Sequence, residues 1–325
     1  MVRVFNIQTV LVYILFVAGF VFLVYGANWL VDGAAGIAKK YNISHVVIGM
    51  TIVALGTSAP ELVVNLIASF KGTADVAMGN ILGSNISNIF LILGLSALIF
   101  PLAVNSNTFK KEVPFALLGA IMIGVLANVV IIGDPGRSMV HRSDGLILVA
   151  FFIVFMVYAF GIAKNKGLPE VPEVKEFPLG MAMVMILSGM LALVLGGRWI
   201  VQGAVEIAGR FGMSEAVISL TVVALGTSLP ELATCIAAAM KRNADIVIGN
   251  ILGSNIFNVF FVLGVSAVIK PLPFNKVLNF DIITGVLAVV LLWVFLWTSR
   301  QQTLRRWHGG VLLALYIAYI TILLW

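Results

Sequence analysis

Long apolar stretches separated by short polar segments run through the whole 325-residue sequence. A stretch of roughly 20 apolar residues is long enough to cross a bilayer as a helix. The pattern therefore predicts an all-α, polytopic membrane protein with about ten spans. Their approximate bounds are 8–37, 44–70, 76–100, 112–132, 144–163, 179–207, 214–240, 246–269, 279–298 and 308–325.

The sequence contains an internal duplication with a constant offset of 170 residues, so that Glu61 corresponds to Glu231. More than half of the positions between Ile43 and Ala97 are identical to their partners, which indicates a repeated structural unit. Each half holds five predicted spans, and an odd number gives the second half the opposite orientation. We expect two inverted five-helix repeats, residues 1–163 and 179–325, joined by a linker at 164–178. The later spans of each half lack this identity and are expected to be scaffold.

The composition supports a membrane protein, because 61% of the residues are hydrophobic and only 10% are charged. A soluble domain carries roughly a quarter charged residues. The net charge of +6 is spread over short loops, so there is no basic face and no nucleic-acid partner is expected. Nothing in the sequence indicates a protein partner or a soluble regulatory module. The single cysteine, Cys235, excludes an internal disulfide.

The basic residues predict the orientation, because Lys and Arg accumulate in cytoplasmic loops. Of the 20 Lys and Arg residues, only Arg198 lies well inside a span. With the N-terminus outside, twelve of the others lie on the inner side and seven on the outer side. We expect a protein of the cell membrane with both termini on the outer side and the linker at 164–178 in the cytoplasm. Asp32 and Glu206, near the cytoplasmic helix ends, are expected to be solvated or interfacial.

A polar motif occurs twice inside apolar spans, as ALGTSAPEL from Ala54 and as ALGTSLPEL from Ala224. A charged side chain at membrane depth is costly, so each glutamate indicates a functional site. Pro60 lacks an N–H group and disrupts its helix, which is expected to free carbonyls near Ala54 to line a cavity. The hydroxyls of Thr57 and Ser58 fall on the same helix face as the glutamate.

A second duplicated motif follows, with the sequence GNILGSNISN from Gly79 and GNILGSNIFN from Gly249. Ser84 and Asn88 lie one helical turn apart in the first copy, as do Ser254 and Asn258 in the second. The two motifs together offer carboxylate, hydroxyl, amide and carbonyl oxygens. Hard cations such as Ca²⁺ take about 6–8 oxygen ligands. All three histidines fall near loops, which argues against zinc, copper or iron.

Simpler explanations exist for single members of this set. Pro60 alone could be a helix kink, and Gly79 and Gly83 form a small-residue packing pattern. Hydroxyls in membrane helices often bond to their own backbone, and Glu61 could pair with Arg198. None of these explains why the whole polar set is repeated in register.

The two motifs resemble the two alpha-repeats of the calcium/cation antiporter superfamily, most closely the prokaryotic sodium/calcium exchangers. The resemblance covers the whole chain and implies that Glu61 and Glu231 are the central ligands. It implies further ligands at Ala54, Thr57, Ser58, Ser84, Asn88, Ala224, Thr227, Ser228, Ser254 and Asn258. Some relatives carry Asp at the position of Asn258, whereas both copies here carry Asn.

The resemblance implies a secondary-active antiporter that exchanges Na⁺ for Ca²⁺ by alternating access, without a cofactor, and that extrudes Ca²⁺. Competition of the two ions for one carboxylate pair favours exchange over co-transport. A proton- or potassium-dependent cation exchanger on the same scaffold and a passive cation channel are the alternatives. An intramembrane enzyme would need a nucleophile–base set or paired aspartates, and the predicted spans contain neither.

Overall fold

The computed structural model describes residues 7–128, 138–163, 177–210 and 224–324, and nearly all of them are helical. Within these ranges, seven single helices and one bent helix pair are long and apolar enough to cross a membrane. They correspond to eight of the predicted spans. The other two, 112–132 and 214–240, extend into residues outside the described ranges, and so does most of the predicted linker at 164–178.

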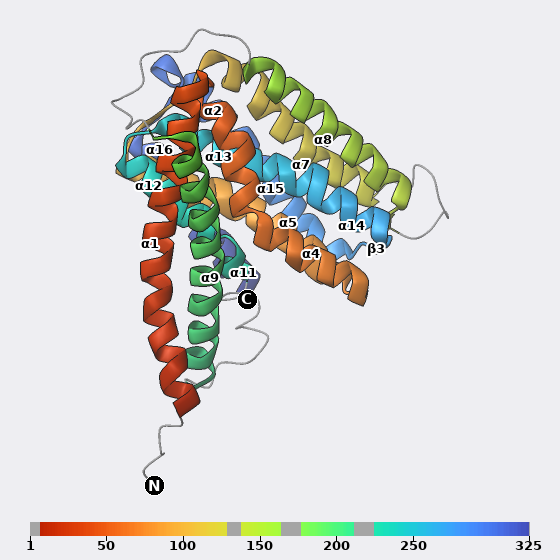
Figure 1. Ribbon diagram of the computed structural model, residues 1–325. Coiled ribbons are helices and arrows are strands. Elements are labelled where there is room, and N and C mark those ends of the chain that lie inside the picture. The colour runs from red at the N-terminus through yellow and green to blue at the C-terminus, as the bar shows by residue number, and fades with distance from the viewer. Residues whose placement is uncertain (1–6, 129–137, 164–176, 211–223, 325) are drawn as a thin grey trace.

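The first helix of each half forms a long pair that extends beyond the other helices (Figure 1). These helices are α1 (Ile7–Tyr41) and α9 (Leu179–Arg210). A Cβ added at Gly19 would lie 2.8 Å from the carbonyl oxygen of Gly196, and one at Gly189 would lie 2.8 Å from that of Gly26. Residue numbers thus rise along α1 as they fall along α9. Two equivalent helices run antiparallel, which confirms that the second half is inverted.

The second span of each half is broken at the first polar motif. In the first half, α2 (His45–Ile48), the π-helical segment η1 (Gly49–Val53) and α3 (Ala54–Thr57) lead to α4 (Ala59–Lys71) across a 48° bend. In the second half, α11 (Ala224–Thr227) leads to α12 (Leu229–Met240). Ser58 and Ser228 occupy the two breaks with nearly identical dihedral angles, φ −85° and ψ 10° against φ −86° and ψ 3°. Both prolines lie at the start of the following helix, where a missing N–H group costs nothing.

The third span of each half carries the second motif and lies in the centre of the molecule. It comprises α5 (Ala74–Ser87), η2 (Asn88–Leu93) and α6 (Gly94–Ile99) in one half. In the other half it comprises α13 (Ala244–Ile256), η5 (Phe257–Leu263) and α14 (Gly264–Ile269). In the span that starts at Ala244, 94% of the most apolar 18-residue stretch is buried, against 33% of the corresponding stretch of α1. Both widen into a π-helix that includes the last asparagine of the motif, a distortion frequent at functional sites.

The later helices also repeat, although their sequences do not. They are α7 (Val113–Asn128), preceded by η3 (Thr108–Glu112), and α8 (Arg142–Ala163) in the first half. Their counterparts are η6 (Lys276–Leu278), α15 (Asn279–Thr298), η7 (Arg300–Gln302) and α16 (Arg306–Leu324). A Cβ added at Gly145 would lie 2.6 Å from the Gly264 carbonyl oxygen, and one at Gly309 would lie 2.5 Å from that of Gly94. The fifth helix of each half therefore packs on the third span of the other half.

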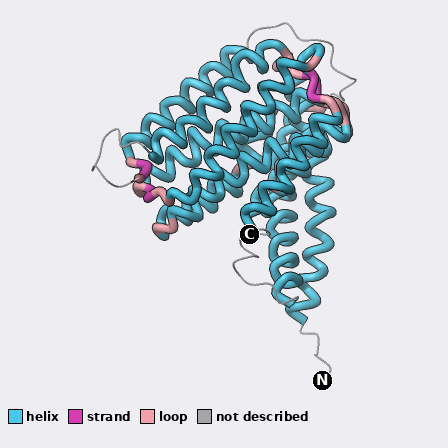
Figure 2. Tube along the Cα trace, turned by 180° about the vertical axis from the view of Figure 1, so that it is seen from behind, coloured by secondary structure: helices cyan, strands magenta, loops and turns pink. Residues whose placement is uncertain are grey.

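Two short antiparallel strand pairs also connect one half to the other. Strand β1 (Leu102–Ala103) pairs with β4 (Thr303–Leu304), and β2 (Met139–Val140) pairs with β3 (Leu272–Pro273). Figure 2 shows the two pairs at opposite ends of the bundle. Each pair joins the end of one third span to the start of the fifth helix of the other half, so the two halves interlock.

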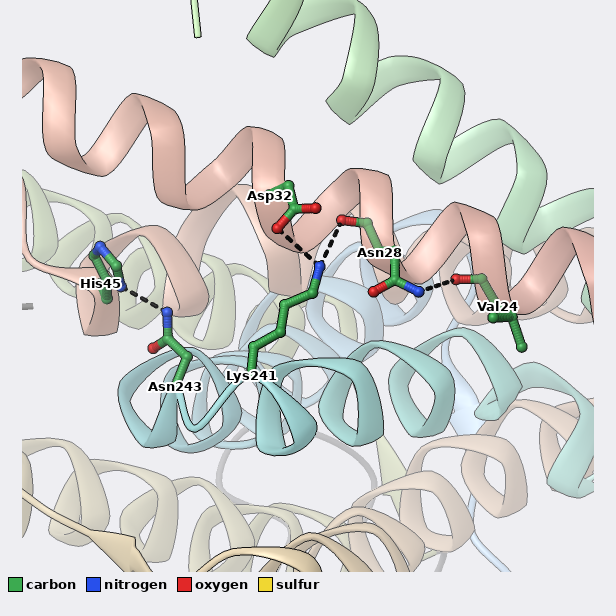
Figure 3. A network of polar contacts seen from close by, with 6 residues as sticks. All are labelled: Val24, Asn28, Asp32, His45, Lys241 and Asn243. Atoms are coloured by element: carbon green, nitrogen blue, oxygen red, sulfur yellow. Dashed lines mark hydrogen bonds and ion pairs between the residues drawn. The ribbon is translucent and has the colours of Figure 1, made fainter. Parts of the chain in front are cut away.

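The turn between α12 and α13 contacts both α1 and α2 (Figure 3). Lys241 Nζ lies 2.8 Å from Asp32 Oδ1, and Asn243 Nδ2 lies 2.7 Å from His45 Nδ1. Glu206 pairs with Arg210 one helical turn away, at 3.0 Å. Asp32 and Glu206 therefore form partly exposed ion pairs near helix ends, as expected from the sequence.

Candidate cation site

The two broken helices place their glutamates deep inside the molecule. Glu61 and Glu231 are each 1% exposed. Within the described part of the chain, Oε2 of each carboxylate has no hydrogen-bond partner. The ion pairs found there, Lys241 with Asp32 and Arg210 with Glu206, involve neither glutamate. Arg198 is exposed, so it does not neutralise Glu61.

The serines at the helix breaks connect the two halves. Ser58 Oγ donates to Glu231 Oε1 at 2.7 Å, and it lies 2.9 Å from Ser254 Oγ. Ser58 has one proton and gives it to the carboxylate, so the Ser254 hydroxyl donates to Ser58. The equivalent contact in the other half joins Ser228 Oγ to Ser84 Oγ at 3.3 Å. Ser58 therefore donates a hydrogen bond to the glutamate of the other repeat, although sequence spacing placed it beside Glu61.

The last asparagine of each second motif presents its side-chain oxygen without a donor. Oδ1 of Asn88 and Oδ1 of Asn258 are buried and have no partner among the described residues. Their amide nitrogens are held instead: Asn88 Nδ2 donates to Asn255 Oδ1 at 2.9 Å, and Asn258 Nδ2 donates to Asn85 Oδ1 at 3.2 Å. Two carboxylate oxygens and two amide oxygens thus remain buried acceptors without donors. Such groups are costly unless a partner such as a cation satisfies them.

The threonines of the first motif contact asparagines that sequence reasoning did not assign to the site. Thr57 Oγ1 donates to Asn250 Oδ1 at 3.1 Å, and Thr227 Oγ1 donates to Asn80 Oδ1 at 3.3 Å. Asn80 and Asn250 were visible as duplicated residues of the second motif. Their duplication in register was the signal that could have identified them.

The Ala54 carbonyl is less free than the sequence suggested. It accepts the Ser58 N–H group at 2.9 Å and lies 3.4 Å from Thr57 Oγ1. The carbonyl that Pro60 deprives of its helical partner is that of Gly56, four residues earlier. A carbonyl has a second lone pair, so Ala54 can still contribute to a cation site. Its counterpart Ala224 begins α11.

The site is therefore a buried, oxygen-lined centre built from matching elements of both halves. No group of three or more His, Cys, Asp or Glu residues that could hold a metal is found in the described ranges. The oxygens instead come from two carboxylates and from neutral hydroxyl and amide groups. This composition suits a hard cation that must bind and leave, rather than a permanently held transition metal.

The inverted repeat, the broken helices and this centre define the class of protein: a polytopic secondary transporter for cations. The model of the family described as "Sodium/calcium exchanger protein" matches residues 11–161 and 181–325. The chain belongs to this sodium/calcium exchanger family.

Individual relatives cover nearly the full chain. The putative antiporter CaxA of Alkalimonas amylolytica is 37% identical, over 93% of this chain and 95% of its own length. The sodium/calcium exchanger MaX1 of Methanosarcina acetivorans is 29% identical, over 96% of this chain and 98% of its own. A structure of the sodium-calcium exchanger NCX_Mj, soaked with Na⁺ and Sr²⁺, aligns with a TM-score of 0.83 at 33% identity. It covers 96% of this chain and 98% of that chain.

Proposed function

We propose that this protein exchanges Na⁺ for Ca²⁺ across the cell membrane by alternating access. The observation that carries the proposal is the pair of buried carboxylates, each with an unpartnered oxygen and with no basic side chain paired to it among the described residues. One Ca²⁺ neutralises both charges. Na⁺ ions spread over the same oxygens do so too, but not while Ca²⁺ occupies them.

The ligand set that we propose is the one expected from the sequence. Glu61 and Glu231 bind Ca²⁺ centrally. Neutral oxygens complete the central position and two flanking Na⁺ positions, and they come from Ala54, Thr57, Ser58, Ser84, Asn88, Ala224, Thr227, Ser228, Ser254 and Asn258. Asn80, Asn85, Asn250 and Asn255 orient these ligands without binding the cations. No cofactor and no protein partner enters this proposal.

The inverted halves provide the two access states. Repeats related by a pseudo-two-fold axis in the membrane plane can exchange conformations, so the site opens to one side and then to the other. Bound ions shift this equilibrium only through their different affinities for the two states. We propose that both termini lie outside and that Na⁺ entry drives Ca²⁺ extrusion. The inside-negative potential opposes Ca²⁺ export, so a ratio above two Na⁺ per Ca²⁺ favours it.

Uptake of ⁴⁵Ca²⁺ into proteoliposomes tests this function. Vesicles loaded with Na⁺ should accumulate ⁴⁵Ca²⁺ when diluted into Na⁺-free buffer, and vesicles without a Na⁺ gradient should not. Accumulation driven by an H⁺ gradient alone would indicate proton/calcium exchange, and dependence on K⁺ would indicate a potassium-coupled exchanger. Calcium entry without any counter-ion would indicate a passive channel.

A further inference from the structure

One buried position breaks the symmetry of the cation site. Asn65 follows Glu61 by one helical turn, and Cys235 follows Glu231 by one helical turn. The two are repeat partners, 170 residues apart, and both are fully buried. Almost every other side chain of the site is matched by the same residue in the other half, so this difference has a defined place in the contact network.

In the first half, Asn65 holds the amide of Asn80 firmly. Asn80 Nδ2 donates to Asn65 Oδ1 at 2.7 Å, and Asn65 Nδ2 donates to the Ala77 carbonyl at 3.1 Å. Asn65 is thereby fixed at both ends of its side-chain amide. The second half replaces this arrangement with a thiol, because Asn250 Nδ2 donates to Cys235 Sγ at 3.3 Å. Sulfur is a weak hydrogen-bond acceptor, so Asn250 is held less firmly than Asn80.

The asparagine held in this way is one of the acceptors of a threonine hydroxyl. Thr57 Oγ1 has one proton and three acceptors nearby, namely Asn250 Oδ1 at 3.1 Å, the Ala54 carbonyl at 3.4 Å and the Glu231 carboxylate. When the proton goes to Asn250, the lone pairs of Thr57 and the second lone pair of Ala54 are free for a cation. When it turns to Ala54, that carbonyl loses this capacity.

We propose that Cys235 is a positioning residue that makes the two flanking Na⁺ positions unequal. Its weak bond to Asn250 lets the Thr57 proton compete for Ala54, which weakens Na⁺ binding beside Thr57 relative to Thr227. Ca²⁺ draws most of its binding from the carboxylates and is affected little. The inference rests on the proposed Na⁺/Ca²⁺ exchange for its functional meaning.

Substitutions at this symmetry-related pair test the inference. Cys235→Asn restores the firm anchor and should lower the half-saturating Na⁺ concentration of ⁴⁵Ca²⁺ exchange about three-fold, the equivalent of one modest hydrogen bond. Cys235→Ser should shift it in the same direction by less, and Cys235→Ala should raise it. Asn65→Cys, the reciprocal control, should raise it about three-fold. The half-saturating Ca²⁺ concentration should stay within about two-fold in all four variants, since a change below one weak hydrogen bond is expected there.

A second readout separates this inference from the proposed function. Bound Na⁺ stabilises the folded protein by an amount that rises with the logarithm of its affinity, so the Na⁺ dependence of the thermal midpoint in detergent should follow the same order of variants. Absence of Na⁺-driven ⁴⁵Ca²⁺ flux in the parent protein would overturn the proposed exchange and leave the thermal order to decide the inference. Equal changes in the half-saturating Na⁺ and Ca²⁺ concentrations would show that Cys235 only fills space. The same conclusion would follow if neither concentration changed in the Cys235→Asn and Cys235→Ser variants.

Discussion

Asn85 and Asn255 each donate a side-chain N–H to the main-chain carbonyl of the other, at 3.4 Å and 3.3 Å. They are repeat partners 170 residues apart, so the pseudo-two-fold axis passes between them. The side-chain oxygens of the same two residues accept the amides of Asn258 and Asn88. This one reciprocal contact therefore joins the two halves and also orients two of the proposed ligands.

Removing either partner should weaken both the protein and the site. Asn255→Leu leaves the buried Asn88 amide without its acceptor, which costs about 1–3 kcal/mol of folding stability. Asn85→Leu should cost a similar amount through Asn258. Residues that share one network couple, so the double variant should lose less than the sum of the two. Thermal unfolding in detergent measures all three, and strictly additive losses would argue that the two asparagines act independently.

The carboxylates should be indispensable for transport. Glu61→Gln and Glu231→Gln preserve shape and one acceptor oxygen but remove a charge that Ca²⁺ requires, so each should abolish ⁴⁵Ca²⁺ exchange. Both variants should still elute as folded protein in size-exclusion chromatography. Glu206→Gln is the matched control, because this glutamate is partly exposed and paired with Arg210. Near-normal flux in either site variant would remove the two-glutamate centre from consideration.

Substitutions of Asn258 test whether a neutral side-chain oxygen contributes to Ca²⁺ binding. Its Oδ1 is buried and unpartnered within the described structure, so Asn258→Leu should weaken Ca²⁺ binding, by about ten-fold for a lost buried polar contact. Asn258→Asp keeps an oxygen at the same place and adds charge, so it should retain Ca²⁺ affinity. Calcium titrations of the thermal midpoint compare the two variants. If both behave like the parent protein, Asn258 does not contact the ion.

The inverted topology can be tested by labelling a pair of repeat partners. Ser106 and Lys276 are 170 residues apart, lie between the third span and the fourth helix of their respective halves, and are both exposed. A cysteine at Ser106 should react with a membrane-impermeant thiol reagent from the cytoplasm, and one at Lys276 should react from outside. Cys235 is fully buried, so the parent protein is a suitable background. Reaction of both from the same side would contradict the proposed orientation of the halves.

Close helix packing makes a prediction at two adjacent glycines of α16. A Cβ added at Gly309 would lie 2.5 Å from the Gly94 carbonyl oxygen, whereas one added at Gly310 meets no described atom within 4 Å. Gly309→Ala should therefore lower stability by about 1–3 kcal/mol through overpacking. Gly310→Ala should be neutral or slightly stabilising, because alanine favours helix. Thermal unfolding of the two variants side by side measures the difference, and equal midpoints would contradict the packing of α16 on α6.

The sequence alone was sufficient for the features that depend on local composition and on duplication. Apolar length predicted the bounds of eight described spans within a few residues. The constant offset predicted the repeat and the odd number of spans in each half predicted its inversion, which the antiparallel pairing of α1 with α9 confirms. The cost of charge at membrane depth indicated Glu61 and Glu231 as candidate site residues, and both are buried.

Only the tertiary structure decided which residues contact one another across the two halves. Ser58 donates a hydrogen bond to Glu231 rather than to Glu61, and Arg198 is exposed instead of paired with the buried Glu61. The later helices repeat in position without repeating in sequence, because lipid-facing scaffold requires apolar character rather than particular residues. Hydrogen bonds between residues of opposite halves depend on how helices break and pack, and no local pattern specifies that. The roles of the positioning asparagines, and the contacts that make Asn65 and Cys235 unequal, therefore emerge only from the folded structure.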